Sequence, residues 1–288
     1  MRQDLIRLAA VRAGQLRRQA GIADHLPVCA IDMATQLGIE VRLVDMGRLE
    51  GTYWPGEPPI IALGAHRPAG RRAFTCAHEL GHHMFGHGNR VDELAPMSAA
   101  DRAKPDEEVL ADAFAAMLLM PQSLIKGAFA QRGWAVGDAT AEQVYVVACW
   151  FGVSYDALAT QMGSMFGLVN RTTLSALRKA QPQSIRQRLA GQACDGLIWT
   201  DEQWPSGHPI DVEVGDLVRL PQGVCVEGRG VSLLDEADGS SFVKAHAAGL
   251  DRAFLPGSEW ACFIRIQPRS YVGRADYRHL DECEEEPD

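Results

Sequence analysis

The sequence has no run of apolar residues that approaches 18, the length that a membrane-spanning helix needs. Its first residues predict an amphipathic helix with several arginines, and they lack the uninterrupted apolar core of a signal peptide. We interpret this segment as a helix that caps a domain. The seven cysteines are scattered and none forms C-x-x-C, a usage typical of free thiols in a reducing cytoplasm. We therefore expect a cytoplasmic protein with no membrane contact.

Acidic residues are absent from positions 157 to 194, although the chain as a whole has a net charge of −9. That net charge argues against a protein built wholly around nucleic acid, and six acids gather in the solvated tail 281–288. The acid-free stretch favours a solvated basic helix face; the alternative is a surface that meets phosphates. The candidate nucleic-acid contacts are Arg178, Lys179, Arg186 and Arg188.

The most informative segment is His78-Glu79-Leu80-Gly81-His82, an H-E-x-x-H motif. Positions i and i+4 of a helix lie on one face, so His78 and His82 can hold one metal ion. Zinc with an open position lowers the pKa of a bound water to about 7, and Glu79 can take its proton as general base for attack on a peptide carbonyl. A small residue at Gly81 would let a neighbouring backbone come close to the metal. The alternative is a histidine-rich surface helix.

The third ligand must come from elsewhere in the sequence. His87 lies five residues beyond His82, whereas the metzincin pattern needs six. His83 follows His82 directly and points about 100 degrees away from it on a helix. We interpret both as structural residues or as partners of the ligands.

Residues 106–121 form an amphipathic helix that ends at Pro121. Glu108 and Asp112 are four residues apart on one face, so Glu108 can supply an oxygen ligand while Asp112 accepts the other ring N–H of a ligating histidine. The alternative is a set of acids that stabilises the helix N-terminus, for which Glu107 would serve as well. We favour Glu108 over Glu107 as the ligand, with Zn²⁺ as the metal and Mn²⁺ as its alternative.

Residues 74–82 and 108–121 together resemble the ImmA/IrrE family of metallopeptidases, and the resemblance extends over residues 20–125 and, loosely, 138–170. Asp112 departs from the asparagine that this family often has there and keeps its hydrogen-bonding role. The resemblance implies a thermolysin-like zincin core with His78, His82 and Glu108 on the metal and Glu79 as the base. It also implies a bacterial or phage-borne enzyme that cuts helix-turn-helix repressors after DNA damage or other stress.

Short strands are expected at 39–44, 49–54 and 59–63, with a turn at 55–58. An edge strand beside the zinc helix could bind a substrate peptide by strand addition, with Tyr53 and His87 as candidate oxyanion or substrate contacts. Residues 88–105 are expected to form a loop.

Residues 139–162 predict a helix-turn-helix, because Thr140 and Gln143 make a capping box and 152–154 make a turn. Asp156 and Ala157 are poor at reading bases, so a structural role is favoured over DNA reading.

From residue 196 the chain turns to short strands, including 217–220, 223–226 and 260–266. We predict an α+β protein with a zincin-like metallopeptidase domain at 1–127, a helical subdomain at 128–190 and a β-rich, GAF-like sensor domain at 191–280. The GAF-like assignment rests on the resemblance alone.

Two functions of different class follow from these patterns. The first is a zinc endopeptidase whose substrate is a helix-turn-helix repressor. The second is a regulatory protein with a non-catalytic metal site that binds a repressor or DNA. Glu79 favours the first, because a purely structural metal site has no use for a base at that position.

Overall fold

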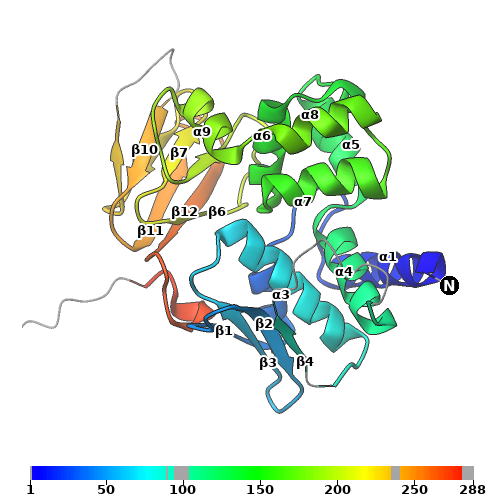
Figure 1. The fold of residues 1–288 in the computed structure, drawn as a ribbon. Helices are drawn as coiled ribbons and strands as arrows, with labels where there is room; N and C mark the ends of the chain where they lie inside the picture. Colours follow the sequence, from blue (N-terminus) through cyan, green and yellow to red (C-terminus); the bar gives the residue numbers. More distant parts are fainter. Residues whose placement is uncertain (1, 89, 94–103, 235–240, 281–288) are drawn as a thin grey trace, which may run out of the picture.

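The computed structural model describes residues 2–88, 90–93, 104–234 and 241–280, which fold into three units (Figure 1). The predicted acidic tail 281–288 and most of the predicted loop 88–105 lie outside the described residues. The first unit carries a sheet covered by helices, the second is helical, and the third is built of strands.

The first unit is a small mixed sheet with α3 (Ala69–Met84) packed across it. Its own strands are β1 (Glu40–Val44), β2 (Leu49–Trp54), β3 (Ile60–Gly64) and β4 (Arg90–Glu93). The order is β13-β1-β3-β2-β4, with β1 parallel to β3 and β2 antiparallel to β3 and β4. The three predicted strands are therefore confirmed within a residue or two.

The structure shows one strand inside the segment that was predicted to be a loop. β2 lies between β3 and β4, so the strand at 49–54 has no open edge of its own. β4 at Arg90–Glu93 is the edge strand, inside the segment predicted to be a loop. A four-residue strand has too little alternation to be recognised from sequence.

Two long helices complete the first unit. α4 (Asp106–Leu119) packs against α3, and the predicted N-terminal helix, α1 (Arg2–Gln19), packs along α4, where Arg17 donates to the carbonyl of Leu118 (2.9 Å). The short helix α2 (Ala30–Gln36) precedes β1. By length and hydropathy the helical stretch Asp106–Gln131 could cross a membrane, yet 61% of its most apolar window is buried inside the fold, as in a core helix of a soluble protein.

The second unit begins with α5 (Gln122–Gln131), so the boundary predicted at 127 falls inside a helix. The remaining helical segments are η1 (Val136–Asp138), α6 (Ala141–Phe151), α7 (Tyr155–Thr160), η2 (Gln161–Met165), α8 (Arg171–Lys179) and α9 (Pro182–Ala190). Thr140 and Gln143 form the predicted capping box, and Gly152 ends α6 in the left-handed conformation (φ 65°). Two helices, α6 and α7, therefore lie on either side of the predicted turn; the helix-turn-helix character and DNA reading stay predictions.

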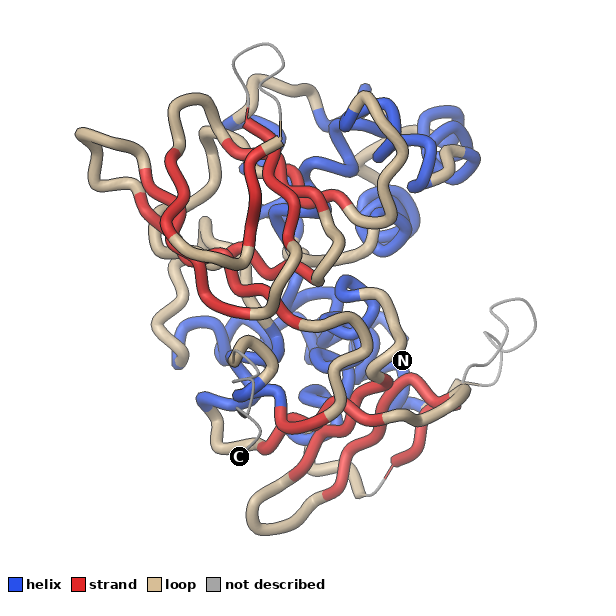
Figure 2. Tube along the Cα trace, turned by 90° about the vertical axis from the view of Figure 1, so that its left-hand side faces the viewer, coloured by secondary structure: helices blue, strands red, loops and turns tan. Residues whose placement is uncertain are grey.

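The third unit consists of two four-stranded sheets, seen in red in the upper part of Figure 2. The first has the order β5-β7-β10-β9 and the second β6-β12-β11-β8. Their strands are β5 (Leu197–Trp199), β6 (Ile210–Glu213), β7 (Leu217–Leu220), β8 (Cys225–Glu227), β9 (Val231–Leu233), β10 (Ser241–Ala245), β11 (Gly249–Phe254) and β12 (Ala261–Gln267). The predicted β-rich character is confirmed, whereas the GAF-like identity stays a prediction.

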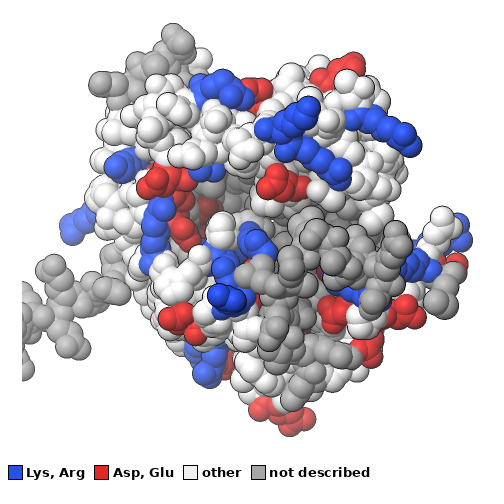
Figure 3. Space-filling model, viewed as in Figure 1, with Lys and Arg blue, Asp and Glu red and all other residues white. Residues whose placement is uncertain are grey.

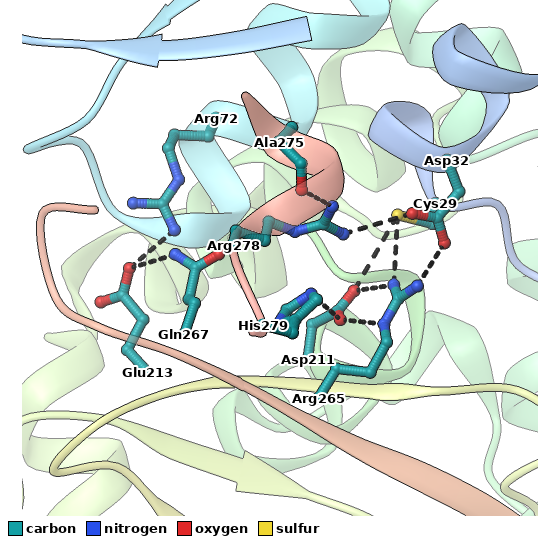
Figure 4. A network of polar contacts seen from close by, with 10 residues as sticks. All are labelled: Cys29, Asp32, Arg72, Asp211, Glu213, Arg265, Gln267, Ala275, Arg278 and His279. Atoms are coloured by element: carbon teal, nitrogen blue, oxygen red, sulfur yellow. Dashed lines mark hydrogen bonds and ion pairs between the residues drawn. The ribbon is translucent and has the colours of Figure 1, made fainter. Parts of the chain in front are cut away.

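The chain then returns to the first unit. β13 (Gly273–Arg274) pairs antiparallel with β1 and is followed by η3 (Ala275–Tyr277). A polar network joins the two units beside this return (Figure 4). Arg265 of β12 contacts Asp211 of β6 (2.5 Å) and reaches across to Asp32 of α2 (2.7 Å). The third unit is therefore joined to the first by a shared sheet and by partly buried ion pairs.

Candidate metal centre

Helix α3 presents two histidines to one point. His78 is 6% exposed and His82 is fully buried, and their Nε2 atoms lie 3.1 Å apart because the two residues are one helical turn from each other. Glu108 of α4 faces the same point, with carboxylate oxygens 3.4 Å from His78 Nε2 and 3.5 Å from His82 Nε2. The predicted ligands are thus brought together from two helices.

The three donor atoms have the spacing of a metal site. Around a tetrahedral zinc ion with bonds of about 2.0–2.1 Å, neighbouring ligand atoms lie roughly 3.3 Å apart. The separations are close to this value: 3.1 Å between the two Nε2 atoms, 3.4 Å from His78 Nε2 to Glu108 Oε2 and 3.5 Å from His82 Nε2 to Glu108 Oε1. One ligand atom from each of the three residues lies within 4.8 Å of the other two. Two imidazoles and one carboxylate leave the fourth position for water or substrate, which is the donor set of a catalytic zinc site.

Gly81 allows the two ligand-bearing helices to approach each other. A Cβ at this position would lie 3.0 Å from the Cα of Ala111 and 3.3 Å from its carbonyl oxygen. Ala111 lies on α4 between Glu108 and Asp112, so the absence of a side chain at Gly81 sets how closely Glu108 comes to the histidines. The close backbone approach predicted for this glycine is confirmed.

Glu79, the predicted base, is fully buried between α3 and the sheet. Gly51 of β2 makes room for it, since a Cβ there would lie 2.9 Å from Glu79 Oε1 and 2.4 Å from the Cγ2 of Thr75. Sequence reasoning did not single out Gly51. A glycine inside a strand is the available signal, because it often marks a close approach of another group.

Asp112 contacts the ring nitrogen of His78 that faces away from the metal position. Its Oδ1 lies 2.9 Å from His78 Nδ1, as predicted, which directs the Nε2 of His78 towards the metal position. Lys104 makes a short ion pair with the other carboxylate oxygen. Burial alone would raise the pKa of Asp112, but the contacts with His78 and Lys104 outweigh it and lower that pKa. The carboxylate is therefore held in its charged, accepting form.

Tyr53 and His87, the two predicted oxyanion or substrate contacts, each form a hydrogen bond with another histidine. His87 Nδ1 is 2.8 Å from Nδ1 of the ligand His82, and the hydroxyl of Tyr53 is 2.9 Å from His83 Nδ1. Tyr53 is only 4% exposed, and burial raises its pKa while lowering that of His83. These groups pack beside the ligands, and the suggested oxyanion role has no contact to support it.

The remaining cysteine and basic residues lie at different places in the structure. Cys76, also on α3, is a fully buried thiol, and burial raises its pKa well above its ordinary value. Arg178 and Lys179 are exposed on α8, in the region where basic side chains stand out at the upper right of Figure 3 among acidic ones. Arg188 pairs with Glu142 (2.6 Å) instead of lying free on a basic face.

Arg186 faces a different feature, a cavity of about 610 Å³ where the three units meet. The N-terminal turn of α3 lines this cavity as well, at the end of the helix away from His82. Nε of Arg186 is buried and has no hydrogen-bond partner. The four predicted nucleic-acid contacts therefore do not form one patch.

The segment that contains the metal centre is similar to a known family. Residues 34–162 match the family model Peptidase_M78, described as the IrrE N-terminal-like domain. This part of the chain is therefore similar to the peptidase domain of the ImmA/IrrE family. The M78 match includes α3, α4 and the helices through α7, so the family domain extends beyond the predicted boundary at 127. No curated protein matches the chain.

Proposed function

We propose that the protein is a zinc-dependent endopeptidase of the cytoplasm that cuts a helix-turn-helix transcriptional repressor in response to stress or DNA damage. The observation that carries the peptidase activity is the cluster of His78, His82 and Glu108 with Glu79 beside it, inside an M78 domain. The cytoplasmic location is supported by the cysteines, since the six in the described residues are all free thiols. Mn²⁺ is the alternative metal.

The chemistry divides between the ion and the chain. Bound zinc supplies Lewis-acid chemistry that polarises a carbonyl and lowers the pKa of a water molecule. Glu79 takes the proton from the attacking water and later passes it to the leaving amine. Its carboxylate is held for this step by the closeness of β2 at Gly51. Asp112 orients the ring of His78, and α4 holds Glu108 beside the two histidines.

Substrate binding is proposed to use the sheet edge. β4 is the strand at the open end of the order β13-β1-β3-β2-β4. An extended segment of the repressor could add to this edge through main-chain hydrogen bonds. The repressor as substrate is supported by the family resemblance, and an exposed interdomain linker is the kind of segment that could extend in this way.

The test is co-expression with the helix-turn-helix protein encoded nearest to the gene, with and without a DNA-damaging treatment, followed by mass analysis of fragments. Wild type and Glu259→Gln, a change at an exposed glutamate, should yield one discrete cut. Glu79→Gln should retain its zinc and cut about 10²- to 10⁴-fold more slowly. Cutting by Glu79→Gln at the wild-type rate would refute the assigned base.

A partner that stays intact with wild type in every condition would count against the repressor as substrate. Retained binding of that partner without cleavage would favour the non-proteolytic regulatory function instead. Nucleic acid is proposed as an activator only through Arg178 and Lys179, since Arg188 is paired and Arg186 lines the cavity. Unchanged DNA affinity after neutralising both residues would remove nucleic acid from the proposal.

A further inference from the structure

Helix α3 ends in a way that folds the chain back onto a metal ligand. Gly86 adopts the left-handed conformation (φ 66°), and its N–H donates to the carbonyl of His83 (3.1 Å). The N–H of His87 donates to the carbonyl of His82 (3.0 Å). This pair of hydrogen bonds is the Schellman motif, in which the residue after the glycine packs against a residue of the last helical turn. That contact is usually apolar, whereas here both residues are histidines.

The two imidazoles meet through a hydrogen bond between their Nδ1 atoms, which lie 2.8 Å apart. Nε2 of His82 is directed at His78 and Glu108, the other two ligand positions. An imidazole that binds a metal through Nε2 carries its proton on Nδ1. His82 must then be the donor and His87 the acceptor in this hydrogen bond.

We propose that His87 is a positioning residue that fixes the tautomer and the ring orientation of the metal ligand His82. The proposal rests on the metal centre of the proposed function. With His87 in this role, each ligating histidine has a partner for the ring nitrogen that does not face the metal, because the carboxylate of Asp112 contacts Nδ1 of His78 in the same way. Phe85 stacks on the ring of His87 (centroids 5.8 Å apart, 22° between planes) and limits its rotation.

The hydrogen bond predicts a specific response to two substitutions of nearly equal shape. His87→Asn places an oxygen where Nδ1 stands and keeps an acceptor, whereas His87→Leu places a methyl group there. Both lose the stacking on Phe85, so they differ mainly in the acceptor. His25→Leu, at an exposed histidine distant in sequence, is the control.

Zinc affinity of the full chain is measured by competition with a chromophoric chelator, and Co²⁺ absorption reports the ligand geometry. His87→Leu is expected to weaken zinc binding about 10- to 100-fold and to change the Co²⁺ spectrum. His87→Asn should stay within about threefold of wild type, as should His25→Leu. Equal affinities in the two His87 variants, whether both normal or both weakened, would overturn the proposal.

A second readout needs no variant. In the zinc-loaded wild type, ¹⁵N NMR of labelled histidine should show His82 protonated at Nδ1 and His87 protonated at Nε2 alone. His82 without a proton on Nδ1 would also overturn the proposal. Wild type that takes up no zinc would instead refute the metal centre itself, so the two failures are distinguishable.

Discussion

Gly81→Ala should weaken metal binding without unfolding the protein. The added Cβ would lie 3.0 Å from Ala111 Cα and 3.3 Å both from the Ala111 carbonyl oxygen and from Cδ1 of Phe114. Carbon atoms in good contact lie about 3.5–4.0 Å apart, so α4 must move away from α3 by about half an ångström. Glu108 is carried on α4, one turn before Ala111, and moves with it.

The magnitude follows from the tolerance of the site. Metal–ligand distances are held within about 0.2 Å, so the displacement of Glu108 exceeds what the site can accept unstrained. We expect the zinc Kd of Gly81→Ala to rise about tenfold or more, equivalent to about 1.4 kcal/mol. Unfolding of the metal-free protein should change by no more than about 2 kcal/mol. The overpacking cost of about 1–3 kcal/mol is offset by about 1 kcal/mol of helix propensity.

The assay combines chelator competition for zinc with urea unfolding of the metal-free protein. Gly127→Ala is the matched control, because Gly127 lies within α5 and a Cβ there meets nothing within 4 Å. It should gain about 1 kcal/mol of stability and leave the zinc Kd unchanged. A Gly81→Ala variant that binds zinc as tightly as wild type would refute the assigned role of the α3–α4 approach.

Three further predictions concern other parts of the molecule. Gly51→Ala should lose about 1–3 kcal/mol of stability in urea unfolding, and adding Thr75→Ser, which removes the methyl group 2.4 Å away, should restore part of it; no recovery would contradict the contact. Burial raises the pKa of Asp216 from 3.8 to about 6, so the folded state binds more protons than the unfolded state between these values and loses stability as the pH rises. The free energy of unfolding of Asp216→Asn relative to wild type should therefore increase by about 2.4 kcal/mol from pH 4 to pH 7, and a pH-independent difference would contradict this. Arg265→Met removes the guanidinium that contacts Asp211 and Asp32, although Arg278 still contacts Asp32, and should cost about 1–3 kcal/mol in the same assay. Arg252→Met, whose ion pair is exposed, should cost less than about 1 kcal/mol; equal losses would contradict the network's role.

The elements with strong local signals were predictable. The strand at 39–44 alternates apolar and polar residues, and the strand at 59–63 is a short apolar run. The capping box of Thr140 and Gln143 marks the start of α6. The metal ligands were predictable for the same reason, since the i and i+4 spacing puts His78 and His82 on one helix face. Glu108 was predictable from its four-residue spacing to Asp112 on one helix face, and the family resemblance pointed to the same residue.

Contacts made over long sequence separations were not predictable. β13 joins the peptidase sheet from about 230 residues beyond β1, and its two residues show no strand pattern. Arg186 belongs by spacing to a basic helix face, yet packing of the three units turns it into the cavity. The sequence left His87 open as a partner of the ligands or as a substrate contact, because its place beside His82 depends on the left-handed turn at Gly86.

The most direct test of the account is X-ray absorption at the zinc edge of the purified wild-type protein. The protein should contain one zinc per chain in a shell of nitrogen and oxygen at about 2.0–2.1 Å, with the scattering of two imidazoles and no sulfur. A chain purified without zinc that takes up none when it is supplied, or a shell that contains sulfur at about 2.3 Å, would contradict the assignment of His78, His82 and Glu108 as the ligands.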